Sequence, residues 1–471
     1  MGGRPKYYVD ATGGNDANTG LTQAAPWKTI AKLNSATLNP GDSVLFKRGE
    51  TWTQTTAQLI CRAHVTYMDY GSGALPIIKT TTAASMAVEI AGDYVTLKNI
   101  NIQSNAAWAI SFTGWVSGAD GEGRSHCLLD GLATTGPINV LGHHNTIRYC
   151  TIDGTSNNGK TGSSLGNGIY ATYPASHHNL IDHNIIHNFT MRCVWLMMLQ
   201  HDNIVSYNTL YAATRGIDFD GAVSVCWNET AIGNLIYDCT TYGINFEAVF
   251  YGIAIGNEIK HCGSQGIMVM TYATNYTDGP NGNDYTENEY VVTNTLLENN
   301  LIHHGTGEGI EFYRANGVKI YGNTIAYNAT QGIKTPEQTS ATNEMVNNLM
   351  LNNGTSNSSK SEVLVAVISF AGVWAVDHHN LVWHPGDQNK AYGMGVSPWT
   401  MTNLAGYQTA SGVGTNSIQA DPVVVDPTNN DFHLQTTSPC KNTGDPTVGS
   451  TIDKDGVIRG AQVDIGCYEF V

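Results

Sequence analysis

Residues 231–259 read AIGNLIYDCTTYGINFEAVFYGIAIGNEI, and this stretch decides the fold because it contains one complete repeat. The segment Ile-Gly-Asn-Leu-Ile around Asn234 returns as Ile-Gly-Asn-Glu-Ile around Asn257. Related segments, each with an Asn before an apolar pair or a Thr-apolar pair, recur on both sides. They are centred on Asn184, Asn208, Asn300, Asn323 and Asn348, at spacings of 23 to 26 residues and one of 43.

A second pattern keeps the same period, because a Gly-Ile pair opens a short alternating segment in most repeats. These pairs begin at Gly168, Gly216, Gly243, Gly266, Gly309 and Gly332. Alternation with period two is typical of strands, and helical spacing is missing from these repeats. A coil of about 23–27 residues cannot bury its apolar side chains alone, so coils must stack. The sequence predicts an all-β fold, a right-handed parallel β-helix of about ten coils over residues 41–430.

The stacked coils make two further predictions. The repeated Asn should take the left-handed backbone of a turn and should hydrogen-bond to the Asn of the next coil. Alternation should point the apolar residues of the Gly-Ile strands inward. These residues are Ile217, Phe219, Ile244, Phe246, Ile267, Ile310 and Phe312.

The ends of the chain differ from the repeats. Residues 1–40 are predicted to be an N-terminal cap, with a short helix at Pro26–Leu33 that plugs the first coil. Residues 431–471 are predicted to be a C-terminal cap of strands and loops that closes the last coil. The spacing of 43 equals one coil plus an insertion at about residues 271–294, which is expected to flank the functional face.

The composition excludes several classes of partner. The chain has 39 acidic and 23 basic residues and a formal net charge of −16. Without a basic footprint, a nucleic acid is an unlikely partner, and a polyanionic glycan would need a bridging cation. No apolar run is long enough to span a membrane. Of the nine cysteines, Cys239 and Cys262 should be buried on adjacent coils, whereas Cys440 and Cys467 are left open as a disulfide.

Both ends of the chain carry a resemblance to a known group of proteins. The opening Tyr7-Tyr8-Val9-Asp10 with Pro26-Trp27-Lys28-Thr29-Ile30, and the closing Ser438-Pro439-Cys440 and Asp464-Ile465-Gly466-Cys467-Tyr468-Glu469, resemble those of bacterial and phage β-helix proteins. This superfamily includes pectate-lyase-like enzymes and β-helix glycoside hydrolases. The resemblance implies a secreted or extracellular protein that acts on a polysaccharide or oligosaccharide, although no signal peptide is present. The oligomeric state stays open.

The outward residues of the Gly-Ile strands contain a row of acids. Stacking in register places Asp220 beside Glu247 and Asp218 beside Asn245, and like charges side by side in a sheet are unfavourable for structure alone. Two carboxyl groups on adjacent coils suit a retaining glycoside hydrolase. Asp220 is the expected nucleophile and Glu247 the expected acid and base. Asp218 and Glu311 are expected to orient the substrate or tune the pKa values.

Aromatic and polar residues on the same rows are expected to bind the sugar chain from an exposed face. The predicted substrate-binding residues are Tyr170, Trp195, Asn245, Tyr313, Arg314 and Tyr272. The plainer interpretation is that exposed acids are common on an acidic protein and that the aromatic residues only pack on its surface.

Two other functions stay open. A polysaccharide lyase or uronate epimerase could hold Ca²⁺ on Asp218, Asp220 and Glu247, whereas the hydrolase needs no cofactor. Its base would be Arg215, Tyr313, Arg314 or Lys334, but Lys334 should lie about three coils from Asp218, which is too far. A non-catalytic adhesin or phage spike is the third interpretation. The histidine pairs at residues 143, 177, 303 and 378 are expected to have turn or stacking roles, and no zinc site is predicted.

Overall fold

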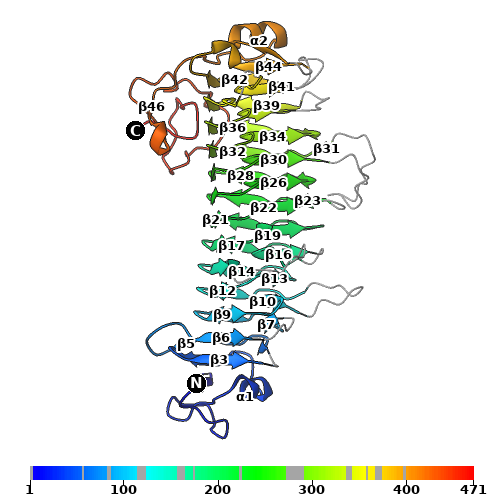
Figure 1. The fold of residues 1–471 in the computed structure, drawn as a ribbon, viewed down its shortest axis with the longest axis vertical. Coiled ribbons are helices and arrows are strands. Elements are labelled where there is room, and N and C mark those ends of the chain that lie inside the picture. The colour runs from blue at the N-terminus through cyan, green and yellow to red at the C-terminus, as the bar shows by residue number, and fades with distance from the viewer. Residues whose placement is uncertain are drawn as a thin grey trace. The chain divides into compact units, whose positions relative to one another are not determined.

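The computed structural model describes residues 4–55, 58–81, 86–113, 123–155, 165–172, 176–221, 225–271, 291–335, 342–356, 359–365, 374–395 and 399–471. The chain forms two compact units, Met1–Ala213 and Thr214–Val471. Each unit is a stack of coils in which three parallel sheets, called A, B and C here, alternate along the chain (Figure 1).

The first unit begins with the short helix α1, Ile30–Ser35, whose Ile30 and Leu33 are buried. Sheet A of this unit contains β1 Lys6–Val9, β2 Ser43–Lys47, β5 Thr66–Tyr70, β8 Thr96–Lys98, β11 Leu128–Asp130, β14 Thr146–Arg148, β17 Leu180–Asp182 and β20 Ile204–Ser206. Sheet B contains β3 Thr51–Gln54, β6 Ile77–Thr80, β9 Asn101–Ser104, β12 Ala133–Thr135, β15 Thr151–Asp153, β18 Ile185–His187 and β21 Thr209–Tyr211. Sheet C contains β4 Leu59–Cys61, β7 Met86–Ile90, β10 Trp108–Phe112, β13 Ile138–Val140, β16 Ile169–Thr172 and β19 Arg192–Met197.

The second unit repeats the same three sheets. Sheet A contains β24 Thr230–Ile232, β28 Ile253–Ile255, β32 Leu296–Glu298, β36 Lys319–Tyr321, β39 Asn343–Val346 and β42 Trp374–His378. Sheet B contains β25 Leu235–Tyr237, β29 Glu258–Lys260, β33 Leu301–His303, β37 Thr324–Ala326, β40 Leu349–Leu351 and β43 Leu381–Trp383. Sheet C contains β22 Arg215–Asp220, β26 Ile244–Glu247, β30 Ile267–Met270, β34 Ile310–Tyr313, β38 Ile333–Lys334, β41 Val363–Val365, β44 Tyr392–Met394 and the antiparallel β45 Thr400–Thr402.

Short elements complete the second unit. Two pairs of short strands extend coils beyond sheet C, namely β23 Cys226–Trp227 with β27 Val249–Phe250, and β31 Val291–Val292 with β35 Ala315–Asn316. The 3-10 helix η3 Gln388–Lys390 and the helix α2 Leu404–Ser411 follow the later coils. The chain ends with β46 Val424–Asp426, the 3-10 helix η4 Pro427–Asn429 and β47 Asp431–Leu434.

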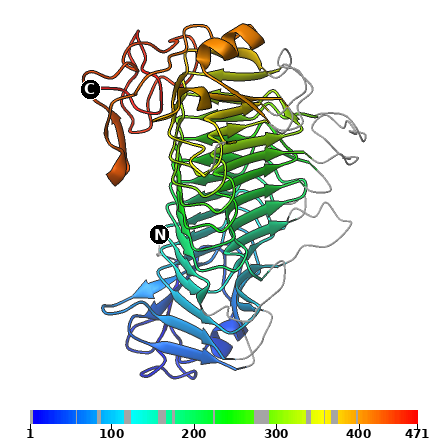
Figure 2. The same ribbon diagram turned by 45° about the horizontal axis from the view of Figure 1, so that its top comes forward.

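The parallel β-helix prediction is confirmed in each unit, and the stacking of coils is visible in Figure 2. The described strands of the two units together give 13 or 14 strands of each sheet, so the chain has more coils than the ten or so predicted. The difference arises early in the chain, where coils are shorter and the Asn pattern is missing. In one such coil, Leu128 pairs with Thr146 only 18 residues later.

The core lies inside the coils, as the alternation predicts. All seven residues that were expected to point inward, including Ile217, Phe219 and Phe246, are fully buried. The rings of Phe219 and Phe246 stack with their centroids 5.2 Å apart. In-register stacking therefore places one apolar side chain directly on the equivalent side chain of the next coil.

The repeated Asn residues form the expected ladder of hydrogen bonds. Asn300 shows the pattern, because its Oδ1 accepts from the backbone N–H and the Nδ2 of Asn257, at 3.0 and 2.9 Å. Its own Nδ2 donates to the Oδ1 of Asn323 at 2.9 Å and to the carbonyl of Ala254 at 2.8 Å. The left-handed backbone, however, was predicted one residue too late. It belongs to the residue before the ladder Asn, for example Asn299 with a φ of 52°.

The Gly of the Gly-Ile pairs is required by the close approach of neighbouring coils. A Cβ on Gly243 would lie 2.6 Å from the carbonyl oxygen of Gly266 and 2.4 Å from the Cγ2 of Ile259. Backbone cannot move away from backbone within a stack of hydrogen-bonded coils. This explains why the sequence marks the start of sheet C strands with Gly.

The C-terminal segment of the second unit folds back along the coils and lies beside β32 and β36 (Figure 1). Its residues Phe432, Cys440 and Ile465 share one buried cluster with Leu301 and Leu349 of sheet B. Its contacts thus reach well beyond the last coil. Cys440 and Cys467 are both buried free thiols, so the disulfide that the sequence left open is not formed. Cys239 and Cys262 are buried, as predicted.

Candidate functional site

Sheet C of the second unit carries the predicted acids on neighbouring strands. Asp218 pairs in register with Asn245, and Asp220 with Glu247, where β22 meets β26. On the next two strands these rows continue through Met268 and Met270 to Glu311 and Tyr313. The register predicted from the Gly-Ile spacing is therefore the register of the structure.

Asp218 is held by two hydrogen bonds. The guanidinium of Arg215 donates to its Oδ2 at 2.7 Å, and the Nδ2 of Asn245 donates to its Oδ1 at 2.7 Å. The Asn245 amide also reaches Glu247, at 3.4 Å from the Oε2. Asp218 and Asn245 are fully buried, so these bonds fix the orientation of both side chains beside the Asp220–Glu247 pair.

Glu247 has the most informative charge state in the row. Burial raises its pKa first, and the nearby Asp220 and Asp218 raise it further, to about 7. Arg215 and Asn245 act in the opposite direction but do not compensate. Glu247 can thus hold a proton at neutral pH, which is what a general acid requires.

Glu311 lies in a separate, compensated cluster two strands further along. The ammonium of Lys334 is 2.9 Å from the Oε1 of Glu311 and 3.3 Å from the Oε1 of Glu308. The Nε2 of Gln265 donates to both carboxylates. Burial would lower the pKa of Lys334, but Glu311 and Glu308 outweigh it and raise that pKa. Along the Asp218 row Lys334 is four strands away, one more than predicted.

The expected exposure of this face was wrong. Asp220, Glu247 and Glu311 are only 6–7% exposed. The cause is that in-register neighbours at the strand spacing of about 4.8 Å shield each other, while Arg215 and Gln265 bond across the row from the strand entrances. Buried like charges are far less screened than exposed ones, so their effect on pKa values is larger.

Two predicted sugar-binding aromatic residues lie in the first unit, on β16 and β19. Tyr170 pairs in register with Trp195, and their ring centroids are 5.0 Å apart. Trp195 was expected to be exposed but is buried, because the guanidinium of Arg192 lies 3.9 Å from its ring centroid. Tyr170 is half-buried, with Trp108 stacked at 5.8 Å on one side.

The remaining predicted residues belong to the second unit. Tyr313 and Arg314 are half-buried at the end of β34, with the guanidinium 5.1 Å from the tyrosine ring. Tyr272 and most of the insertion lie outside the described residues. The insertion departs directly after Met270 and Thr271, where the row of Glu247 ends.

Sequence reasoning missed the residues at the strand entrances. Tyr242 lies 4.9 Å from the Arg215 guanidinium, and burial, with Glu311, Glu247 and Asp218, raises its pKa despite Arg215. Gln265 and Glu308 bind Glu311 from the same positions on later coils. They all stand one to three residues before an inward Ile, so the coil alignment itself contained the signal that could have found them.

Within the described ranges, the groups of three or more side chains whose ligand atoms lie within 4.8 Å of one another are built on histidine pairs. Asp218, Asp220 and Glu247 are not such a group. In the part of the chain that the structure describes, no helix is long and apolar enough to cross a bilayer.

Comparison with known proteins gives one family match and several partial likenesses. Residues 86–281 match the family model of the right handed beta helix region. A stretch of 45 residues is 49% identical to a lacto-N-biosidase of Bifidobacterium longum subsp. longum, covering 9% of this chain and 3% of that relative.

Solved structures with a similar trace include a lacto-N-biosidase from Eubacterium ramulus, with a TM-score of 0.43 and 15% identity over 70% of this chain and 64% of that chain. The mannuronan C-5 epimerase AlgE6 A-module of Azotobacter vinelandii gives 0.47 and 13% over 81% and 91%. Pectate lyase Pel9A gives 0.40 and 13% over 100% and 98%. With its three parallel sheets and the matched repeat region, the chain belongs to the right-handed parallel β-helix superfamily.

Proposed function

We propose that this chain is a carbohydrate-active enzyme, a retaining glycoside hydrolase that cleaves a polysaccharide or oligosaccharide with Asp220 and Glu247. The observation that carries the proposal is the in-register pair of buried carboxyl groups on β22 and β26, one of which has a pKa of about 7. Equivalent atoms on adjacent strands are about 4.8 Å apart, near the roughly 5–5.5 Å between the two carboxyl groups of retaining enzymes.

The two acids would divide the reaction between them. The Asp220 carboxylate attacks the anomeric carbon while protonated Glu247 gives its proton to the departing glycosidic oxygen. Glu247, now ionised, then takes a proton from water. That water displaces Asp220 from the glycosyl-enzyme and restores both groups. Because the pKa of Glu247 lies near neutrality, the same side chain can serve in both steps.

The neighbouring residues suit roles in positioning. Arg215 and Asn245 hold Asp218 at the side of the pair, where it raises the pKa of Glu247. Tyr313 and Arg314 lie in the rows that lead away from the acids and could contact further sugar units. We assign Tyr170 and Trp195 of the first unit the same kind of role, and leave Glu311 as an orienting group.

The short sequence likeness to a curated lacto-N-biosidase also supports a role in glycan cleavage, although it spans only 45 residues. A protein that degrades extracellular glycans would be secreted, and we propose that location as well. Neither the sugar nor the choice between internal and terminal cleavage follows from the acid pair.

The test is product analysis on a glycan panel with three variants. Asp220→Asn and Glu247→Gln should each lower turnover by at least about 100-fold. The Glu247→Gln loss should be smallest for substrates with good leaving groups, because these need little acid help. Azide should partly rescue Glu247→Ala, since it can replace water at the glycosyl-enzyme. Asp238→Asn is the matched control, because this carboxylate on the same unit is 58% exposed and outside the rows.

Other outcomes would replace the proposal. Near-normal turnover in Asp220→Asn and Glu247→Gln would show that the acid pair is not the catalytic pair. An unsaturated product absorbing in the ultraviolet, formed only with Ca²⁺, would identify a lyase. Glycan binding without turnover in the wild type would identify an adhesin or spike.

A further inference from the structure

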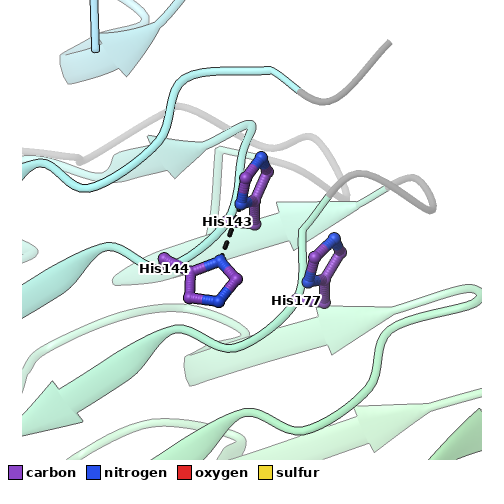
Figure 3. Close-up of side chains that lie close together, drawn as sticks. All are labelled: His143, His144 and His177. Carbon is purple, nitrogen blue, oxygen red and sulfur yellow. Dashed lines mark hydrogen bonds between the residues drawn. The ribbon is translucent and has the colours of Figure 1, made fainter. Parts of the chain in front are cut away.

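Three consecutive turns of the first unit bring histidines together away from the acids. The turns before β14, β17 and β20 begin with His143-His144, His177-His178 and His201-Asp202. Figure 3 shows His143 and His177 one above the other, with the ring of His144 beside them. This histidine cluster, defined as His143, His144, His177, His178 and His201, has no part in the proposed hydrolysis.

The rings form two stacked columns. In one column His143 stacks on His177 and His177 on His201, with centroids 4.8 and 4.5 Å apart. In the other, His144 stacks on His178 at 4.7 Å. Within each His-His pair, the two Nδ1 atoms are 2.8 Å apart, so one carries the proton and the other accepts it. Packing on both faces therefore fixes the ring planes before any ligand arrives.

Stacking alone does not account for histidine in both columns. The column of His144 continues through His126 and Tyr94, so any aromatic ring serves there. The column of His143 has a non-aromatic residue in the equivalent positions of earlier turns, Ser125 and Asp93. Histidine occupies both columns only where the turns follow one another, and imidazole differs from other rings in its ability to bind transition metals.

We propose that the histidine cluster binds one divalent transition-metal ion, such as Zn²⁺, centred on His143, His144 and His177. Each residue offers a ring nitrogen, and these nitrogens all lie within 4.8 Å of one another. Two nitrogens bound to one tetrahedral zinc ion are roughly 3.4 Å apart. The Nδ1 atoms of His143 and His144, at 2.8 Å, need to separate only slightly once the ion replaces the shared proton.

The charge state and exposure of the cluster favour a cation as ligand. Burial, followed by the neighbouring imidazoles, lowers the pKa of His177 to about 4, so this ring is neutral at pH 7 and keeps its lone pair. His144 is exposed, which leaves a path from solvent to the ring nitrogens. Asp202 accepts from or binds the Nδ1 of His201 at 2.7 Å, and such carboxylates orient histidines around metal ions.

The test is calorimetric titration of tag-free full-length protein with ZnCl₂, comparing wild type with His177→Phe and His304→Phe. Phenylalanine keeps the stacking ring but removes the ligand, so His177→Phe should bind one ion fewer, or bind it at least about tenfold more weakly. His304→Phe is the matched control. His304 shares a 2.8 Å Nδ1–Nδ1 contact with His303 and a pKa lowered to about 4, but that pair belongs to no group of three ligands in the described residues.

Two further readouts keep the result decisive. Zinc binding should release a proton, seen as a dependence of the measured heat on the ionisation enthalpy of the buffer. The number of ions bound is compared because His378, His379 and Asp445 form another candidate group in the second unit. The proposal is overturned if wild type binds no Zn²⁺, or if His177→Phe binds as many ions as tightly as wild type. If His177→Phe does not fold, His144→Gln at the exposed ligand must show the same loss.

Discussion

Glu247 and Glu311 show how one face can hold two acids with opposite behaviour. Both are buried to the same degree. Glu311 has a lysine at 2.9 Å, whereas Glu247 has Asp220 as its in-register neighbour. A buried carboxylate without a compensating cation is unfavourable for stability, and such sites are often kept for chemistry.

This contrast predicts opposite effects of two Glu→Gln variants on stability. The pKa of Glu247 is raised from 4.5 to about 7, so ionisation disfavours the folded state as pH rises from 4.5 to 7 and remains unfavourable above. Glu247→Gln should therefore increase the free energy of unfolding at pH 8, by up to about 3 kcal/mol, with little change near pH 4. Glu311→Gln should decrease it by about 1–3 kcal/mol, because Lys334 loses a partner. Urea unfolding at both pH values measures each effect, and a destabilised Glu247→Gln at pH 8 would contradict the assignment.

The sequence predicted which residues share a row but not what surrounds them. Register follows from the repeat, since the 27 residues between Gly216 and Gly243 equal one coil. Burial of Trp195 and of the acids depends on where Arg192, Arg215 and Gln265 place their flexible side chains. No periodicity specifies those conformations, and this is why the expected exposed face was wrong.

At the scale of elements, the Asn ladder is the feature that the sequence predicted best. The period gave the position of every ladder residue quoted from the repeat, and the hydrogen bonds run between successive coils as expected. The left-handed turn residue was displaced by one because the pattern does not distinguish the Asn that hydrogen-bonds inward from the residue before it. Only the backbone shows that residues such as Asn299 and Asn347 take this conformation.

The ladder predicts a large stability cost for a small substitution. Asn300→Ala removes bonds to Asn257, Asn323 and Ala254 at once and leaves their buried polar groups unpaired. We expect a loss of about 3 kcal/mol in the free energy of unfolding, since each unpaired group costs about 1–3 kcal/mol. Asn389→Ala, at an exposed position, is the control and should change stability by less than about 0.5 kcal/mol. Equal melting temperatures for the two variants would show that the ladder contributes little.

At the scale of the whole molecule, sequence repeats predict contacts between neighbouring coils but not between distant segments. The C-terminal segment contacts several coils of the second unit, through bonds such as that from the Cys467 N–H to the Thr324 hydroxyl. Arg459 also donates to the Asn299 side chain, 160 residues away. Such contacts follow no period, so the sequence gave no reason to place this segment along the side of the coils.

The insertion can be tested because the register defines where the coil would close without it. Met270 pairs with Tyr313 and Val291 with Ala315, while Tyr313 and Ala315 are separated by Arg314 alone. Residue 271 thus corresponds to Arg314, and residues 272–290 are additional to the coil. Joining residue 271 directly to Val291 should restore an ordinary coil. Gly at position 271 would help, because Arg314 and the equivalent Ala248 have φ values of 53° and 51°.

We expect this deletion to leave the melting temperature within a few degrees of wild type, because coils contact mainly their neighbours. The segment leaves the coil at the end of the Glu247 row, so turnover of a polymeric substrate should fall sharply, while short substrates with good leaving groups should be affected less. The matched control is the single change Thr271→Gly, which keeps the insertion. Polymer turnover equal to that of the control would show that the insertion has no part in catalysis. Unfolding of the deletion variant alone would show that the coil depends on residues 272–290 for its stability.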